Sequence, residues 1–286
     1  MSRSVREPRV WGRAAVARML DGVRRREPAV IWGNEPMNGG NFLFLWATAW
    51  ARHRATGSPW LVRRKPKMAP WLEEFPALQT LTVDEADVSF WQPRTVEWGQ
   101  QAYLDWFYRD LVEFAAGHLL SSKRFRRRLD RMDREAVVVN VRRGDYYSDP
   151  VHRANYGFDI PGYVRAAVSR VPEADLERIV LVSDDVEWCR RNLGFLADHA
   201  SVHTIPGAHD MFDDLAQIAG GRHLILANST FSYWGGYISS ALPPQVRARS
   251  VQAPLHFTRL YARGESPLLL PQWRAIPDDE FDPADD

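Results

Sequence analysis

The sequence predicts an α/β fold in which a doubly wound parallel sheet forms the second half of the chain. From residue 136 onward, short β-branched runs alternate with segments of helical spacing, and this alternation is typical of right-handed βαβ units. The 286 residues are 45% hydrophobic and 26% charged. This composition is that of ordinary globular proteins, and the length suffices for two domains of about 100–150 residues each.

Four runs have the length and composition of strands that are buried on both faces of a parallel sheet. They are 136–141 (AVVVNV), 179–182, 202–205 and 224–227. Apolar residues at spacings of three and four predict helices between and after these runs. The predicted helices are 162–171, 186–196, 211–219 and 232–240.

The part of the chain before residue 121 is interpreted as helical pieces separated by proline-containing loops. Residues 42–52 fit a buried helix, and 98–119 carry apolar residues at helical spacing. Residues 121–135 (SSKRFRRRLDRMDRE) are strongly charged. Because acids are interleaved with the arginines, a solvated helix joining two domains is favoured over a nucleic-acid patch. The predicted domains are therefore 1–134 and 135–286, with the last residues free to pack back on the first domain.

Composition and charge exclude several classes of function. The chain has 37 Lys and Arg against 36 Asp and Glu, whereas dedicated nucleic-acid binders carry a large basic excess. Cys189 is the single cysteine, so no intrachain disulfide can form, which fits a reducing compartment. No apolar run approaches the roughly 20 residues of a membrane span, and the first residues lack a signal-peptide core. We therefore expect a cytoplasmic protein with at most a peripheral membrane association.

Polar clusters follow three of the predicted strands at their carboxyl ends. The first strand runs into Arg142, Arg143 and Asp145, the second ends at 183–185 (SDD), and the last ends at 228–232 (NSTFS). In a parallel sheet these ends meet at one edge, where open α/β folds bind their ligands. We therefore expect two arginines, several acids and a group of hydroxyls in one crevice.

Each cluster suits one part of a nucleoside diphosphate. The guanidinium groups of Arg142 and Arg143 can bind phosphate oxygens through paired, charge-assisted hydrogen bonds. The hydroxyls of 229–232 lie where a helix is predicted to begin, and its free N–H groups offer a second anion site. Asp184 or Asp185 can accept hydrogen bonds from ribose hydroxyls or from the N–H edge of guanine. Taken singly, each cluster is also explained as a surface loop or a helix cap.

Four blocks of the sequence resemble the signatures of one enzyme family, in that family's order. Residues 140–146 (NVRRGDY) resemble the His-x-Arg-Arg-Gly-Asp-Tyr signature of α-1,2-fucosyltransferases, glycosyltransferase family 11. Residues 183–189 (SDDVEWC) are similar to its Ser-Asp-Asp-x-Glu-Trp-Cys block. The segment from Asp214 through 227–234 (ANSTFSYW) resembles its third block, and 39–44 (GGNFLF) resembles its amino-terminal Gly-Asn-Gln loop.

The resemblance implies a GT-B-like fold, in which two Rossmann-like domains face a cleft. It also implies an inverting, metal-independent glycosyltransferase that needs no cofactor. Such an enzyme moves L-fucose from GDP-β-L-fucose, its donor substrate, to a hydroxyl of a glycan or glycosylated small molecule, here the 2-OH of galactose. By position, Arg142 holds the β-phosphate, Asp184 lies near the guanosine, and Gly40 and Asn41 close over the donor. The implied donor-binding residues are Gly40, Asn41, Asn140, Arg142, Arg143, Asp184, Asn228, Ser229, Thr230, Phe231 and Ser232.

Arg142 and Asp145 are the candidate catalytic residues. Breaking a glycosyl–phosphate bond puts negative charge on the leaving diphosphate, which a fixed cation stabilises. Asp145 is a candidate general base by location only, and a structural carboxylate paired with Arg143 is an equal alternative. Two residues depart from the family pattern. Asn140 replaces a His and cannot carry a proton at neutral pH, and Phe42 replaces a Gln, which affects the acceptor side.

Three other functions stay open. A metal-dependent GT-A enzyme would use 183–185 as an acidic metal motif, although the paired arginines make that ion redundant, so no metal ligand is predicted. A non-catalytic GDP- or sugar-binding relative is suggested by Asn140 and Phe42. A related enzyme could use another GDP-sugar or fucosylate another hydroxyl. The acceptor side is assigned to the first domain, with Trp32, Trp46 and Trp98 as candidate contacts.

Overall fold

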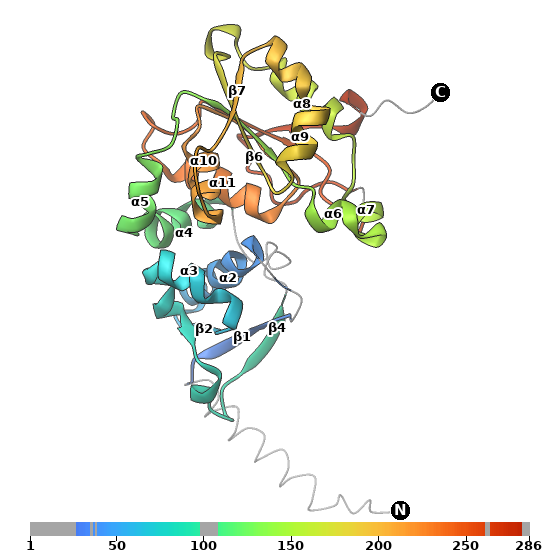
Figure 1. Cartoon of the computed structure of the whole chain (residues 1–286). Helices are drawn as coiled ribbons and strands as arrows, with labels where there is room; N and C mark the ends of the chain where they lie inside the picture. The colour runs from blue at the N-terminus through green and yellow to red at the C-terminus, as the bar shows by residue number, and fades with distance from the viewer. Residues whose placement is uncertain (1–26, 35–36, 38, 98–107, 261–263, 282–286) are drawn as a thin grey trace, which may run out of the picture.

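The computed structural model describes residues 27–34, 37, 39–97, 108–260 and 264–281. These residues form two parallel β-sheets, each with its own helices, which lie one above the other in Figure 1. The larger sheet belongs to the second half of the chain. No helix in the described ranges is both long and apolar enough to cross a membrane.

The first sheet has four strands in the order β3-β2-β1-β4, and every neighbouring pair is parallel. Its strands are β1 (Ala29–Gly33), β2 (Trp60–Arg63), β3 (Thr82–Val83) and β4 (Arg94–Glu97). Its helices are α2 (Gly40–Thr56) and α3 (Ala69–Glu74), with short 3-10 turns η1 (Pro66–Met68), η2 (Pro76–Leu81) and η3 (Glu85–Asp87).

The prediction of helical pieces alone before residue 121 is therefore wrong, although the buried helix predicted over 42–52 is confirmed as α2. β3 and β4 escaped detection because they are short or polar, whereas β1 (AVIWG) is a buried apolar run that the prediction overlooked. β3 has two residues, and β4 (RTVE) alternates exposed with half-buried positions. Such segments give neither a buried apolar run nor a clear alternation.

The second sheet has six parallel strands in the order β10-β9-β8-β5-β6-β7. They are β5 (Val137–Val141), β6 (Arg178–Ser183), β7 (Ser201–Thr204), β8 (His223–Ile225), β9 (Ser250–Pro254) and β10 (Arg274–Ile276). The four predicted strands are confirmed as β5 to β8. Counted from β7, the strands come third, second, first, fourth, fifth and sixth in chain order. This is the Rossmann order, in which the side on which successive strands are added to the sheet switches between β5 and β8.

Helices cover both faces of the second sheet, as expected for a doubly wound fold. They are α4 (Tyr108–Phe114), α5 (Lys123–Leu129), α6 (Gly144–Ser148), α7 (Pro150–Tyr156), α8 (Ile160–Val168), α9 (Val186–Asn192), α10 (Met211–Gly220) and α11 (Thr230–Ala241). A π-helix, η5 (Ala115–Leu119), continues α4, and η6 (Glu173–Asp175), η7 (Gly194–Asp198) and η8 (Asp278–Glu280) are short 3-10 turns. Alternate residues of β5 belong to opposite faces: Val138 packs in the core with α10 and α11, whereas Val139 packs in the core with α8 and α9. The predicted α/β, GT-B-like architecture of two Rossmann-like units is thus confirmed.

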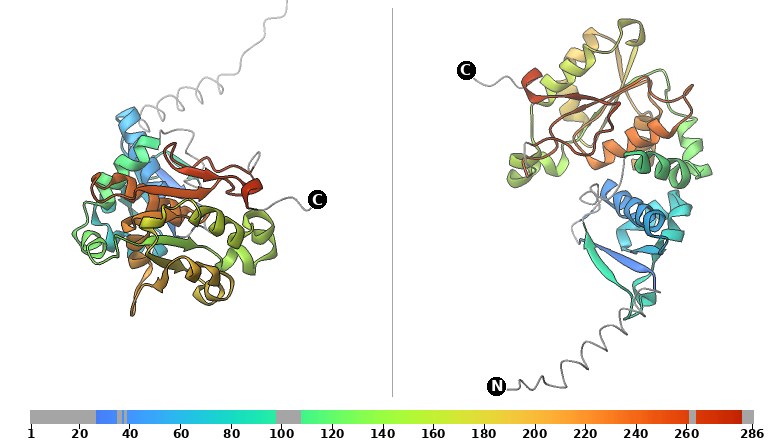
Figure 2. Two further views of the ribbon diagram at one scale, coloured as in Figure 1. Left: turned by 90° about the horizontal axis from the view of Figure 1, so that it is seen from above. Right: turned by 180° about the vertical axis from the view of Figure 1, so that it is seen from behind.

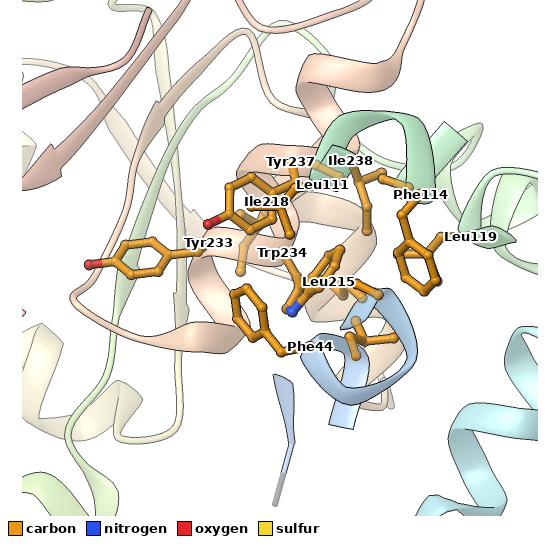
Figure 3. Close-up of a cluster of buried hydrophobic side chains, with 14 of the residues drawn as sticks. Phe44, Leu111, Phe114, Leu119, Leu215, Ile218, Tyr233, Trp234, Tyr237 and Ile238 are labelled. Carbon is orange, nitrogen blue, oxygen red and sulfur yellow. The ribbon is translucent and has the colours of Figure 1, made fainter. Parts of the chain in front are cut away.

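The two units share one continuous apolar core (Figure 3). The ring of Phe44, on α2, lies 5.0 Å from that of Trp234, on α11, and Phe114 of α4 lies 5.7 Å from the same indole. The right-hand view of Figure 2, which shows the molecule from behind, has α2 in blue against α11 in orange. The first unit is therefore packed firmly on the helical layer of the second.

Two segments show how the chain is distributed between the units. Helices α4 and α5, which the predicted boundary at residue 134 assigns to the first domain, pack against α11 and α10 respectively. At the carboxyl end, the ring of Phe281 lies 5.5 Å from that of Tyr163, on α8. Residues 282–286 lie outside the described residues, so the position of the last residues stays a prediction.

Candidate functional site

A cavity of about 400 Å³ opens at the carboxyl ends of β5, β6 and β8, where the strand order of the second sheet reverses. The first unit contributes Gly39, Gly40 and Asn41, at the start of α2. The second unit contributes Asn140, Val141, Arg142, Asp145, Tyr146, Val182, Ser183, Asp184, Met211, Asp214, Ser229, Thr230 and Phe231. The cavity lies between the two units and has the size of an ordinary small-molecule site.

Two helix N-termini meet at this cavity. Helix α11 begins at Thr230, and the hydroxyl of Ser229 caps it by accepting from the backbone N–H of Ser232 at 3.3 Å. Helix α2 begins at Gly40, and no side chain caps it. A Cβ atom on Gly40 would lie 2.7 Å from backbone atoms of Thr230 and Phe231, so glycine is required for this approach. The free N–H groups and the dipoles of both helices favour a bound anion.

Arg142 adds a full positive charge to the same cavity. Its Nη2 donates to Oδ1 of Asp145 at 2.6 Å, and its Nη1 lies 2.9 Å from Oδ2 of Asp184. Burial opposes the charge, but the two carboxylates outweigh it and raise the pKa of the Arg142 guanidinium. The side chain is 40% exposed, so it is held in place while still open to a ligand.

Asn140 holds the floor of the cavity together. It is buried on β5, and its Nδ2 donates to the backbone oxygen of Val182, on β6, at 2.9 Å. Its Oδ1 accepts from the hydroxyl of Ser232, on α11. Both ends of the amide are therefore occupied in joining two strands to a helix. Ser232 is fully buried and does not line the cavity.

Arg143, the neighbour of Arg142, points away from the cavity. Its guanidinium carbon lies 4.1 Å from the ring centre of Trp188 and 4.4 Å from that of Tyr147. Its Nε lies 3.3 Å from Oδ2 of Asp185, the residue that caps α9. The structure thus separates two arginines that are adjacent in the sequence and uses Arg143 to stabilise the surrounding loops.

Asn228 also lies outside the lining of the cavity. Its Nδ2 donates to the backbone oxygens of Tyr156, at 2.9 Å, and Phe257, at 3.1 Å. It is 1% exposed, so its amide fixes the path of the chain between β8 and α11. Ser229, Thr230 and Phe231, which follow it, do line the cavity.

Asp214 lines the cavity from α10. It was not among the predicted site residues and was named only as the start of the third block that resembles the family. Burial raises the pKa of its carboxyl to about 6, with His209 opposing the rise and Asp213 and Asp210 adding to it. The Nε2 of His209 lies 3.4 Å from Oδ1 of Asp214. A partly buried carboxylate in a cavity with an anion site is a candidate for recognising hydrogen-bond donors of a ligand.

The candidate acceptor contacts and acidic motif have other surroundings. Trp46 is fully buried, and its Nε1 donates to Oγ1 of Thr82 at 2.9 Å, so it cannot touch an acceptor. Trp32 lies under the guanidinium of Arg63, at 4.5 Å, and Trp98 lies outside the described residues. In the described part of the chain, no three His, Cys, Asp or Glu side chains are grouped as a metal site requires.

The fold and the cavity define a GT-B-like α/β protein in which two helix N-termini and Arg142 converge on a cavity between its units. The model of glycosyl transferase family 11 matches residues 96–244, more than half of the chain. The chain therefore belongs to glycosyl transferase family 11.

Two curated relatives come from Escherichia coli. The O-antigen biosynthesis glycosyltransferase WbnK is 26% identical over 104 residues, which cover 36% of this chain and 34% of that protein. An alpha-1,2-colitosyltransferase is 26% identical over 106 residues, which cover 37% of each chain. The match therefore spans little more than a third of their length.

Among solved structures, the chain is similar to POFUT1. In complex with GDP, that protein shows 13% sequence identity and a TM-score of 0.38, with 82% of this chain and 78% of that chain covered. In complex with GDP-fucose the identity is 12% and the TM-score is again 0.38, with 80% and 74% covered.

Proposed function

We propose that this protein is a glycosyltransferase that moves L-fucose from GDP-β-L-fucose to a hydroxyl of a glycan or glycoside acceptor, with inversion and without a metal. One observation carries the proposal: Arg142 and the N-termini of α2 and α11 converge on a single cavity. Membership of the family supports glycosyl transfer. The relative that is an alpha-1,2-colitosyltransferase supports transfer to a 2-hydroxyl, and its name keeps another donor sugar open.

The diphosphate would lie between Arg142 and the two helix N-termini, since these groups supply its positive surroundings. The base would then point toward Asp214. A carboxylate accepts two hydrogen bonds side by side, and guanine offers N1–H and an adjacent amino group. Asp184 is already bound to Arg142 and to the backbone N–H of Arg143, at 2.8 Å. We therefore assign the guanine contact to Asp214, whereas the sequence suggested Asp184 or Asp185 for the ribose or the guanine edge.

In the proposed reaction the bond between the sugar C1 and the β-phosphate oxygen breaks, and its electrons stay on the departing GDP. Arg142 and the helix N-termini stabilise that charge, which is the largest contribution that such a site offers. The acceptor oxygen attacks C1 from the opposite face, which inverts the configuration. Its proton would pass to Asp145, the exposed carboxylate that Arg142 holds at the cavity.

A thermal-shift titration with GDP, UDP, CDP and ADP, each with and without EDTA, tests the donor site. A ligand present at a hundredfold excess over Kd stabilises the native state by about 2.7 kcal/mol. We expect a shift with GDP alone that EDTA does not change. A shift that prefers UDP or requires a metal would contradict the proposal.

Turnover is tested separately by release of GDP from GDP-fucose in the presence of galactose-terminated acceptors. Release that depends on the acceptor is the expected result, and the same assay with other GDP-sugars determines the donor. GDP binding with no turnover of any GDP-sugar would favour the non-catalytic binding protein instead.

A further inference from the structure

One guanidinium group outside the cavity binds three carboxylates at once. Arg128, on α5, has a side chain that is 9% exposed. Its Nε and Nη2 bind the two carboxylate oxygens of Glu74 at 3.0 and 3.3 Å. Its Nη1 and Nη2 bind the two oxygens of Asp210, both at 2.9 Å, and Nη1 lies 2.7 Å from Oδ1 of Asp213. These contacts use every N–H group that an arginine has.

The three carboxylates come from both units. Glu74 ends α3 of the first unit and is 1% exposed. Asp210 caps the N-terminus of α10 and forms a capping box with Asp213. The hydroxyl of Ser122, which caps α5, also donates to the backbone oxygen of Glu74 at 2.6 Å. Arg128 therefore ties the start of α10 to the first unit through α5.

The start of α10 is also a wall of the cavity. Met211 and Asp214 line the cavity, whereas Asp213 faces Arg128. Successive residues of an α-helix point about 100° apart, so a helix held through Asp213 presents Asp214 to the cavity in a fixed direction. Gly40 and Asn41, which also line the cavity, belong to the unit that carries Glu74. Arg128 thus fixes these two parts of the cavity relative to each other.

The charge of Arg128 has a second consequence for the cavity. Asp210 and Asp213 add to the raised pKa of Asp214, which means that three carboxylates crowd the start of α10. Arg128 neutralises the two outer ones. Without the charge of Arg128, Asp210 and Asp213 would lose their main cation, and their negative charges would repel an anionic ligand in the cavity.

We propose that Arg128 is a positioning residue for the nucleotide end of the cavity, which holds the start of α10 against α3 so that Asp214 and Met211 keep their places. The inference rests on the proposed function, because it takes the ligand at α10 to be the base of GDP. A purely structural ion pair would stabilise the fold without changing how the cavity binds its ligand.

Hydrogen exchange of the ligand-free protein tests the hold on α10 without any nucleotide. Arg128→Lys keeps the charge, but a single ammonium cannot bind two carboxylates in a bidentate manner. Glu74→Gln removes the carboxylate of the first unit that binds Arg128 while keeping Arg128 itself. It replaces the lysine variant in the experiment if that variant fails to fold. Arg124→Lys is the matched control, because Arg124 lies on the same helix and, among the described residues, forms its ion pairs with Glu73 and Glu74 on α3 and not with α10.

We expect amide exchange in residues 210–216 to quicken in Arg128→Lys and Glu74→Gln and to stay unchanged in Arg124→Lys. The Kd for GDP should rise about tenfold in the first two variants, the size of a coupling between residues in contact. In an Asp214→Asn background, Arg128→Lys should raise the Kd by much less than tenfold, because most of its effect passes through Asp214.

Two results would overturn the inference: unchanged exchange at the start of α10, or an effect on GDP binding that adds in full to that of Asp214→Asn. Failure of the proposed function gives a different result, since the unaltered protein would then bind no GDP. The exchange measurement would still decide whether Arg128 holds α10.

Discussion

Replacing Arg142 by methionine removes the one positive side chain among the described residues that line the cavity. The substitution keeps the length of the side chain but leaves Asp145 and Asp184 without their cation, at the place where a diphosphate would bind. Loss of one preorganised donor to a developing negative charge costs about 3–4 kcal/mol, or about 10²–10³ in rate. We expect at least that loss of turnover in Arg142→Met, because two uncompensated carboxylates add repulsion.

Arg143→Met provides the matched control. The side chain of Arg143 lies against Trp188 and Tyr147, outside the cavity. Its loss should lower the free energy of unfolding by about 1–2 kcal/mol through the stacking contacts and leave the Kd for GDP unchanged. Both variants are compared by calorimetric titration with GDP and by GDP release from GDP-fucose. Equal losses in the two variants, or full activity in Arg142→Met, would refute the assignment of roles to the two arginines.

Three further predictions follow from the same geometry. Gly40→Ala should raise the Kd for GDP about tenfold or more, because the new Cβ would push α2 and α11 apart. Gly117→Ala is the control and should leave the Kd unchanged, because nothing lies within 4 Å of its new Cβ. Equal Kd values in the two variants would contradict this prediction. GDP affinity should fall as the pH drops below about 6, where Asp214 takes up a proton. Titrations of Asp214→Asn should keep only the weaker dependence that comes from the terminal phosphate of GDP, which is protonated in the same range. Burial lowers the pKa of His223, although Asp175 opposes this shift. The folded state therefore binds the proton of His223 less tightly than the unfolded state does. The free energy of unfolding should then fall as the pH drops below 6.5, the pKa of this imidazole in the unfolded state. The measurement is the urea midpoint of the unaltered protein and of His223→Gln at a pH above and a pH below 6.5. An equal change of the midpoint with pH in both proteins would contradict the prediction.

The second sheet could be predicted because its strands are buried on both faces. Runs such as 136–141 then read as continuous apolar segments, and the parallel order brings their polar ends together at one edge. This reasoning led to Arg142 and to the start of α11. In the first sheet, β3 and β4 gave no such signal because they are too short or too polar. β1 (AVIWG) is a buried apolar run, and the prediction overlooked it.

The roles of individual side chains could not be read from the sequence in the same way. Arg142 and Arg143 follow the same strand, and the contacts of Arg143 with Trp188, Tyr147 and Asp185 decide which of them leaves the cavity. Asp214 lies on a helix that was predicted, but the direction of that helix depends on contacts distant in sequence, among them Arg128 with Asp210. Such a contact is invisible to local periodicity.

The apolar junction between the units explains why the anion site can be preorganised. The helices whose N-termini form the site, α2 and α11, are packed on each other through Phe44 and Trp234. Because close-packed cores resist deformation, the distance between the two N-termini is set by packing behind the site and not by the ligand. Donors that are fixed before the reaction require no reorganisation when charge develops. The same contact that buries the indole of Trp234 therefore also keeps the positive ends of both helices aimed at one point, beside Arg142.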